Sequence, residues 1–226
     1  MNLINLKNKK VFITGGTAGI GLSILESFYK LEADIFTIGT NVENLKTIQS
    51  NFPKIKTSNF NLENHQKIEE LVKEAKEKLG GLDIVINNAG VTKDNLAIRM
   101  SDEEWNKVIN INLTAVFLIC KYSIKVMMKQ DSGSIINISS IVGHTGNFGQ
   151  ANYSSAKAGI VAMSLPVPNF PIGIFSISFF LNSSLIFLVI FVSINPGDIQ
   201  FTLIFFFAYS FARLFDIATI PALALE

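Results

Sequence analysis

A tyrosine and a lysine four positions apart are the residues of this chain that most clearly suggest chemistry. In a helix, Tyr153 and Lys157 would lie one turn apart on the same face. A free tyrosine has a pKa near 10, too high for efficient proton exchange near neutral pH, and an adjacent ammonium group lowers that pKa. Tyr153 could then protonate a carbonyl oxygen as a hydride arrives. By itself, such a pair is more often a surface feature than a catalytic one.

Two glycine-containing segments could bind a phosphorylated ligand. Residues 14–21 (Thr-Gly-Gly-Thr-Ala-Gly-Ile-Gly) lie between a predicted strand and a predicted helix, where a pyrophosphate can accept hydrogen bonds from backbone N–H groups. Residues 87–90 (Asn-Asn-Ala-Gly) end another predicted strand, at the edge where open parallel sheets bind ligands. Each segment could also be an ordinary turn. Their context in an alternating chain favours a dinucleotide site.

Strand and helix patterns alternate along the first 164 residues. Short β-branched runs predict strands at 9–14, 35–38, 83–87 and 134–138, whereas apolar residues at helical spacing predict helices at 20–31, 68–79 and 102–128. Gly80 and Gly81 end the second helix, and Ser101 with Glu104 forms a capping box for the third. This alternation predicts an α/β fold with a Rossmann-like, doubly wound parallel sheet.

Together these motifs resemble the short-chain dehydrogenases, and the resemblance covers residues 6 to 164. Within that family the chain looks most like the bacterial 3-oxoacyl-[acyl-carrier-protein] reductases. The matching segments are 14–21, 87–90, 108–113 (Val-Ile-Asn-Ile-Asn-Leu), 138–143 (Ile-Ser-Ser-Ile-Val-Gly) and 149–153 (Gly-Gln-Ala-Asn-Tyr), with Lys157 one turn further on.

The resemblance implies a role for each matching residue. Ser140 would hydrogen-bond the substrate carbonyl, Tyr153 would be the acid, and Lys157 would hold the nicotinamide ribose and tune Tyr153. Asn112 would keep a water for the proton relay. The expected cofactor-binding residues are Thr14, Gly15, Gly16, Thr17, Gly19, Ile20, Gly21, Thr40, Asn61, Leu62, Asn88, Ala89, Gly90, Tyr153 and Lys157.

The residues after the second strand favour NADP(H) over NAD(H). A carboxylate at this position would bind the ribose hydroxyls and repel a 2′-phosphate, but residues 39–42 read Gly-Thr-Asn-Val. Asn61 stands where the family commonly has Asp against the adenine, and its amide can make a similar hydrogen bond.

Composition narrows the partners and the compartment. The 19 basic and 18 acidic residues leave a net charge of +1, so nucleic acid is not expected as a partner. The single cysteine, Cys120, cannot form an internal disulfide, and the first residues show no signal peptide, so we expect a cytoplasmic protein. His65 and His144 have no clustered partners, and no metal site is expected. The family's carrier-protein site has basic residues after Met127-Met128-Lys129, whereas this chain has Gln130-Asp131, which weakens the expectation of an acyl carrier protein partner.

The composition changes class after Ser164. Residues 158–197 contain no charged residue, and 12 of the 19 phenylalanines follow position 165. We therefore expect two regions: a catalytic domain over 1–164, truncated after the sixth helix region, and a non-native hydrophobic tail over 165–226. The uncharged run 172–194 is long enough to span a membrane, although polar residues interrupt it. The basic helix and sixth strand that the family would add here do not appear in the sequence.

The genetic code explains the tail better than a membrane anchor does. Consider translation of the opposite DNA strand in the frame in which the first two bases of each codon pair with the first two bases of a sense codon. In this frame, a sense codon for Ala is read as Ala, one for Gly as Pro and one for Val as Thr. Read backwards from Glu226 to Asp216, the tail obeys this rule against residues 154–164 at all eleven positions. The preceding sense pair, Asn152-Tyr153, becomes a stop codon, and residues 204 back to 194 fit a sense strand I-K-V-N-C-I-S-P-G-F-I. We hypothesise that 165–226 translate an inverted copy of the same gene.

These observations predict NADPH-dependent reduction of 3-oxoacyl-[acyl-carrier-protein] to the 3-hydroxyacyl form, in fatty acid biosynthesis. A short-chain dehydrogenase for a small alcohol, a sugar or a steroid is the first alternative, and a membrane-tethered, non-catalytic nucleotide-binding protein is the second. Family members are usually homotetramers. Because this chain lacks the family's substrate-covering segment and final elements, we expect it neither to assemble so nor to be active as written.

Overall fold

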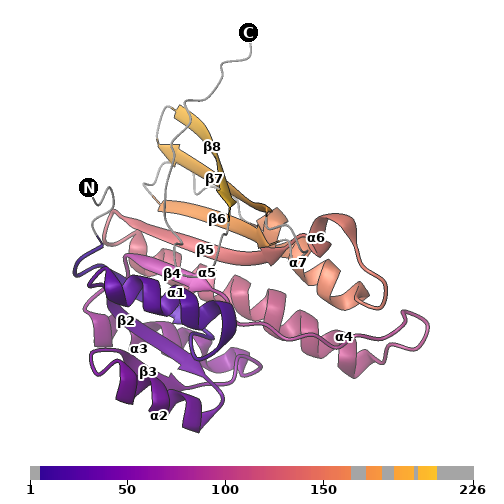
Figure 1. Cartoon of the computed structure of the whole chain (residues 1–226), viewed down its shortest axis with the longest axis horizontal. Helices are drawn as coiled ribbons and strands as arrows, with labels where there is room; N and C mark the ends of the chain where they lie inside the picture. Colours follow the sequence, from indigo (N-terminus) through magenta and orange to yellow (C-terminus); the bar gives the residue numbers. More distant parts are fainter. Residues whose placement is uncertain (1–5, 164–171, 180–185, 196–197, 208–226) are drawn as a thin grey trace.

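The computed structural model describes residues 6–163 and three later strands at 172–179, 186–195 and 198–207, and its sheet runs through the whole molecule (Figure 1). Five strands precede Ser164: β1 (Lys10–Thr14), β2 (Asp34–Gly39), β3 (Lys56–Asn59), β4 (Ile84–Asn87) and β5 (Gly133–Ser140). All five pair in parallel. The order β3-β2-β1-β4-β5 reverses direction at β1, as in a doubly wound sheet, so the predicted fold class is confirmed.

Helices cover both faces of this sheet, because neighbouring strand residues point to opposite sides. Val11 and Ile13 pack in one buried cluster with α1 (Gly19–Lys30) and α2 (Val42–Asn51). Phe12 packs in the other with α3 (Ile68–Leu79) and α5 (Ala115–Met127). The crossovers therefore form the two outer layers, and the carboxyl ends of the parallel strands meet at one edge.

The predicted helix boundaries are confirmed to within a few residues. Gly80 has a left-handed φ of 78° at the end of α3, as a glycine C-cap requires. At the start of α4 (Asp102–Ile109), Ser101 Oγ accepts from Glu104 N and Glu104 Oε2 accepts from Ser101 N, which completes the predicted capping box. The short η1 (His65–Lys67) directly precedes α3. Sequence patterns did not reveal α2 or the one-turn α6 (Val142–Thr145), in which His144 lies.

The predicted helix 102–128 is interrupted by a π-helical turn, η2 (Asn110–Thr114), between α4 and α5. Such turns widen the helix locally and are frequent at functional sites. Within the described part of the chain, Asp102–Met127 is also the one helical stretch long and apolar enough to cross a membrane. Its apolar residues Val116 and Ile119 are buried against the sheet, as in a core helix.

Three strands after Ser164 extend the sheet. Strand β6 (Ile172–Phe179) pairs in parallel with β5, and β7 (Ile186–Asn195) and β8 (Asp198–Phe207) follow as antiparallel neighbours. The uncharged run 172–194 thus contributes to β6 and β7. Residues 164–171, at the boundary predicted between domain and tail, lie outside the described residues.

Candidate active site

In the glycine-rich turn between β1 and α1, close backbone contacts leave no room for a side chain at Gly21. Gly15 has a φ of 68°, and a Cβ on Gly21 would lie 2.1 Å from Gly15 O. The N-cap residue of α1 is Ala18, which has no polar side chain to occupy the first N–H groups of the helix. The turn therefore presents backbone donors at a helix N-terminus, the arrangement that binds a phosphate.

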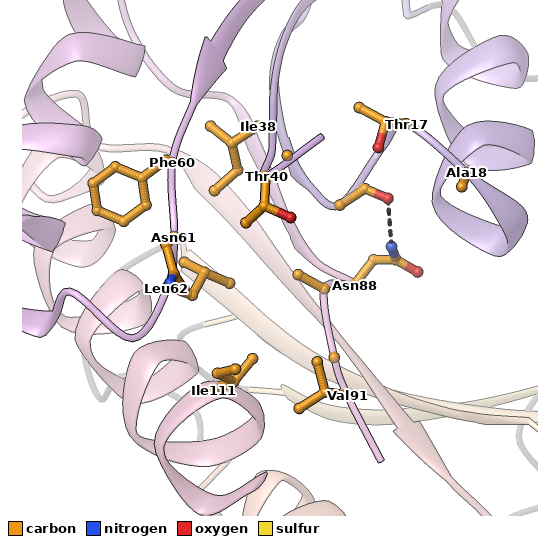
Figure 2. Close-up of a pocket in the computed structure, with 14 residues that line it drawn as sticks. Thr17, Ala18, Ile38, Thr40, Phe60, Asn61, Leu62, Asn88, Val91 and Ile111 are labelled. Carbon is orange, nitrogen blue, oxygen red and sulfur yellow. Dashed lines mark hydrogen bonds between the residues drawn. The ribbon is translucent and has the colours of Figure 1, made fainter. Parts of the chain in front are cut away.

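Asn88 joins this turn to the end of β4. Its Nδ2 donates to Thr14 O and to Gly15 O, both at 3.1 Å. Figure 2 shows the bond to Gly15 as a dashed line. The buried Thr14 Oγ1 accepts from the backbone N–H groups of Asn88 and Ala89, also at 3.1 Å. These bonds hold the carboxyl ends of β1 and β4 together beside the crevice.

A cavity of about 340 Å³ opens at this edge of the sheet. Figure 2 shows its side chains converging from β2, the segment after β3, the loop after β4 and η2. Eight residues expected to bind a cofactor line it: Gly15, Thr17, Thr40, Asn61, Leu62, Asn88, Ala89 and Gly90. The other expected residues do not line it: Thr14, Gly16, Gly19, Ile20, Gly21, Tyr153 and Lys157. Of these, Thr14, Gly16 and Gly21 instead make contacts that shape the turn.

Six lining residues were not expected from the sequence: Ala18, Ile38, Gly39, Phe60, Val91 and Ile111. Five of them are adjacent to an expected residue or to Asn112, and Ile38 lies two positions before Thr40, so proximity to a motif was the only available signal. Apolar side chains such as Ile38 and Val91 give the cavity walls on which a planar ring can pack.

The cavity residues fit a dinucleotide. Thr40 is exposed at the end of β2, and no carboxylate lines the cavity, so nothing there would repel a 2′-phosphate. The Asn61 amide is engaged with Glu63: its Nδ2 donates to Glu63 Oε2 and its Oδ1 accepts from Glu63 N. An adenine amino group would have to share this amide.

Ser140, Tyr153 and Lys157 come together between the end of β5 and α7 (Ala151–Met163). Lys157 is 4% exposed, its Nζ donates to Ile138 O at 2.7 Å, and it lies 5.6 Å from the centroid of the Tyr153 ring. Ser140 hydrogen-bonds the Tyr153 side chain. Gly90 approaches Lys157 from the cavity side, since a Cβ there would lie 3.9 Å from Nζ. The predicted trio therefore meets the cavity lining at Gly90, through Lys157.

The titration properties of the pair differ from the expectation. Burial raises the pKa of the Tyr153 phenol, with Asp94 raising it further and the hydrogen bond from Ser140 lowering it. Burial also lowers the pKa of Lys157 from 10.5 to about 8. The predicted lowering of the Tyr153 pKa was wrong for this structure, because desolvation of the phenol outweighs the favourable hydrogen bond with Ser140.

Asn112 is fully buried in η2 and holds the loop after β4. Its Nδ2 donates to Val91 O at 2.7 Å, and its Oδ1 accepts from Val91 N at 2.8 Å. The side chain is thus used in positioning the loop, which leaves the backbone of the π-helical turn as the part of Asn112 that could bind a water.

Cys120 lies in a buried polar cluster with Asn87 and Asn137. Asn87 Nδ2 donates to Asn137 Oδ1 at 2.8 Å and to Cys120 Sγ at 3.4 Å. Burial raises the pKa of the Cys120 thiol to about 12, so it is a neutral core group rather than a nucleophile.

Comparison with known proteins agrees with this geometry. The family model described as short chain dehydrogenase matches residues 9–167. The chain belongs to the short-chain dehydrogenase family.

Curated relatives match the same part of this short-chain dehydrogenase. The 3-oxoacyl-[acyl-carrier-protein] reductase FabG of Rickettsia felis is 44% identical over 163 residues, or 72% of this chain and 66% of that protein. Nodulation protein G of Rhizobium sp. (strain N33) is 40% identical with the same coverage. The reductase FabG of Chlamydia pneumoniae is 39% identical over 165 residues, or 71% of this chain and 66% of that protein. The aligned part of the chain thus spans about two thirds of the length of these relatives.

Proposed function

We propose that residues 1–164 carry the cofactor-binding and catalytic part of an NADPH-dependent reductase that converts a 3-oxoacyl thioester to its 3-hydroxyacyl form. The observation that carries the proposal is the grouping of Ser140, Tyr153 and Lys157, with Lys157 next to Gly90 of the cavity lining. The similarity to reductases named for 3-oxoacyl-[acyl-carrier-protein] supports the substrate class.

Each residue of the reaction centre would have its own role in the reaction. NADPH, when bound, supplies the hydride that forms the new C–H bond. Ser140 holds the substrate carbonyl by a hydrogen bond, and Tyr153 O–H donates the proton that turns the carbonyl oxygen into a hydroxyl. Lys157 holds the ribose and, when protonated, favours the phenolate left on Tyr153. Asn112 would keep a water for the return of the proton to Tyr153.

The acyl group would be presented by an acyl carrier protein, and the reaction would take place in the cytoplasm. Position 40 carries a threonine in place of a carboxylate, and no carboxylate lines the cavity, which supports NADP(H) over NAD(H). Because Gln130 and Asp131 replace the family's basic residues, we propose weak binding of the carrier protein. In keeping with this, the Gln130 side chain is engaged with Leu82: Nε2 donates to Leu82 O, and Oε1 accepts from Leu82 N.

We propose that residues 165–226 are the translated inverse of the same gene, separate in origin from the catalytic domain 1–164. The relation between 154–164 and 216–226 supports this proposal. The nucleotide sequence tests it: the last eleven codons must be the reverse complement of the region that encodes 154–164. Any other nucleotide sequence there rejects the proposal.

A chimera tests the function separately from the tail. Residues 1–164 are joined to the corresponding remainder of the Rickettsia felis reductase, and both this protein and the chain as written are assayed for oxidation of NADPH with an acetoacetyl thioester. We expect turnover from the chimera, its loss on Tyr153→Phe, and no homotetramer from the chain as written. A chimera that reduces sugars or steroids but no 3-oxoacyl thioester would instead support another short-chain dehydrogenase activity. A chain that binds NADPH only in membranes would support a tethered nucleotide-binding protein.

A further inference from the structure

A fully buried asparagine directly precedes Tyr153 and uses its whole amide group. Asn152 is 0% exposed. Its Nδ2 donates to Lys93 O at 2.9 Å and to Glu104 O at 3.2 Å, and its Oδ1 accepts from Tyr153 N at 2.7 Å. Tyr153 N belongs to the first turn of α7, where backbone N–H groups have no partner within the helix. One side chain thus connects the backbone of Tyr153 to two other elements.

The first of these elements is the loop after β4, which also forms a wall of the cavity. Its start, at Asn88, Ala89 and Gly90, lines the cavity, and Lys93 follows three residues later. Asn112 holds the same loop at Val91 by two hydrogen bonds. Two buried asparagines therefore hold one short loop, one from η2 and one from α7.

Two further hydrogen bonds, nearer the surface, also connect the loop after β4 to the residues just before α7. Asn95 N donates to Gly149 O at 2.8 Å, and Gln150 Nε2 donates to Asp94 Oδ2 at 3.0 Å. The second element, α4, is reached through Glu104, whose backbone accepts from Asn152 and whose side chain accepts from Asn95 Nδ2. The loop after β4, the start of α4 and the first turn of α7 thus form one hydrogen-bonded unit.

We propose that Asn152 is a positioning residue that places the Tyr153 phenol relative to the cofactor cavity, by tying the first turn of α7 to the loop after β4 and to α4. A purely structural role predicts lower stability without a change at Tyr153. A positioning role predicts a change in the environment and reactivity of the Tyr153 phenol itself. The kinetic part of this inference rests on the proposed reductase function, whereas the spectroscopic part does not.

The first experiment measures ionisation of Tyr153 in the chain as written. Ultraviolet difference titration of each protein against its Tyr153→Phe counterpart isolates this phenol from the other three tyrosines. The groups that face it are Asp94, Ser140 and Lys157. In Asn152→Ala we expect the midpoint to fall from its raised position toward the ordinary value near 10, because the displaced phenol gains water. Asn152→Ser, which keeps a shorter polar group, should show a smaller fall and serves if the alanine variant does not fold.

Asn137→Ala is the matched control, since Asn137 is equally buried and hydrogen-bonded but lies in β5 among Asn87 and Cys120. We expect it to lower Tm without moving the Tyr153 midpoint. An unchanged Tyr153 midpoint in the folded Asn152 variants, with Tm lowered as in the control, would overturn the proposal.

The second experiment uses the chimera. Asn152→Ala should lower kcat by about 10- to 100-fold, as expected when a catalytic group is misplaced, and should change the Kd for NADPH by a smaller factor, because Asn112 still holds the cavity end of the loop at Val91. A variant that raises KM alone, with kcat intact, contradicts positioning of the proton donor. If the chimera shows no reductase activity at all, the proposed function fails, while the titration still decides the role of Asn152.

Discussion

The crevice has a cofactor half, at the glycine-rich turn, and a reaction half, at Tyr153 and Lys157, and the two differ in the kind of chemical groups that form them. The cofactor half is made of backbone and small side chains: Gly15 and Gly21 pack against each other, and Asn88 bonds to main-chain carbonyls. The reaction half is made of titratable side chains in a half-buried or buried setting, Tyr153 and Lys157, whose pKa values both depart from the ordinary ones. Shape and hydrogen-bond direction therefore determine what the cofactor half can bind, and desolvation determines the pKa values of the reaction half. Substitutions should separate binding from chemistry accordingly.

The largest effect is expected at the proton donor. In the chimera described above, Tyr153→Phe should lower kcat by about 1,000-fold, since general acid catalysis contributes on this scale. The Kd for NADPH, measured by fluorescence titration, should change little, because the hydroxyl lies outside the glycine-rich half. Undiminished turnover would show that Tyr153 is not the acid.

Lys157→Met tests desolvation in the reaction half. The folded pKa of Lys157 is lowered to about 8 from 10.5, so the unfolded chain binds more protons between these values and stability rises with pH through this window. Below about pH 8 both states are protonated and the burial penalty, on the order of 3 kcal/mol, is fully present.

Urea denaturation of the chain as written should therefore show a difference that depends on pH. The advantage of Lys157→Met over the parent should be greatest near neutral pH and should shrink from pH 8 to 10.5. Lys129→Met, which changes an exposed lysine, should show no such trend. A constant difference across this range would mean that Lys157 is not desolvated.

Gly21→Ala tests shape in the cofactor half. Because the added Cβ would lie 2.1 Å from Gly15 O, the turn must shift, and we expect weaker NADPH binding by about tenfold or more, the equivalent of 1–3 kcal/mol for overpacking. Gly80→Ala, at a left-handed position with open space, should lower stability and leave the Kd unchanged. Equal loss of binding in both variants would assign the effect to stability alone.

The smallest effect is expected from Thr40→Asp. A carboxylate at the end of β2 should repel the 2′-phosphate and accept hydrogen bonds from ribose hydroxyls, shifting preference from NADPH toward NADH by about tenfold. The ratio of the two Kd values measures this shift. Asn51→Asp adds the same charge at the far end of α2 and should not change the ratio.

Local sequence signals were sufficient for most of the fold. Alternating periods predicted the strands and helices, and specific residues such as Gly80 and the Ser101–Glu104 pair predicted helix ends, because caps depend on a few neighbouring atoms. The π-helical turn at Asn110–Thr114 could not be predicted in this way. It accompanies a contact 21 residues away, between Asn112 and Val91, which no local period encodes.

Some residues of the candidate site could likewise be predicted from the sequence, and others could not. Motif and resemblance indicated Ser140, Tyr153 and Lys157, and the structure brings them together beside the cavity. They gave no role to Asn152, since two of its three partners, Lys93 O and Glu104 O, become neighbours only when α7 packs against α4 and the loop after β4. Nor did they indicate Phe60 and Val91 as cavity walls.

The sequence by itself was sufficient to predict the family, the reacting groups and the codon-level relation between residues 154–164 and 216–226, because all three predictions depend only on residue types and their order; of the three, the family is confirmed. The tertiary structure decided the electrostatics. The sequence predicted that Lys157 would lower the pKa of Tyr153, but burial of both side chains raises the first pKa and lowers the second. Desolvation is a property of the packed surroundings, and spacing along a helix does not report it.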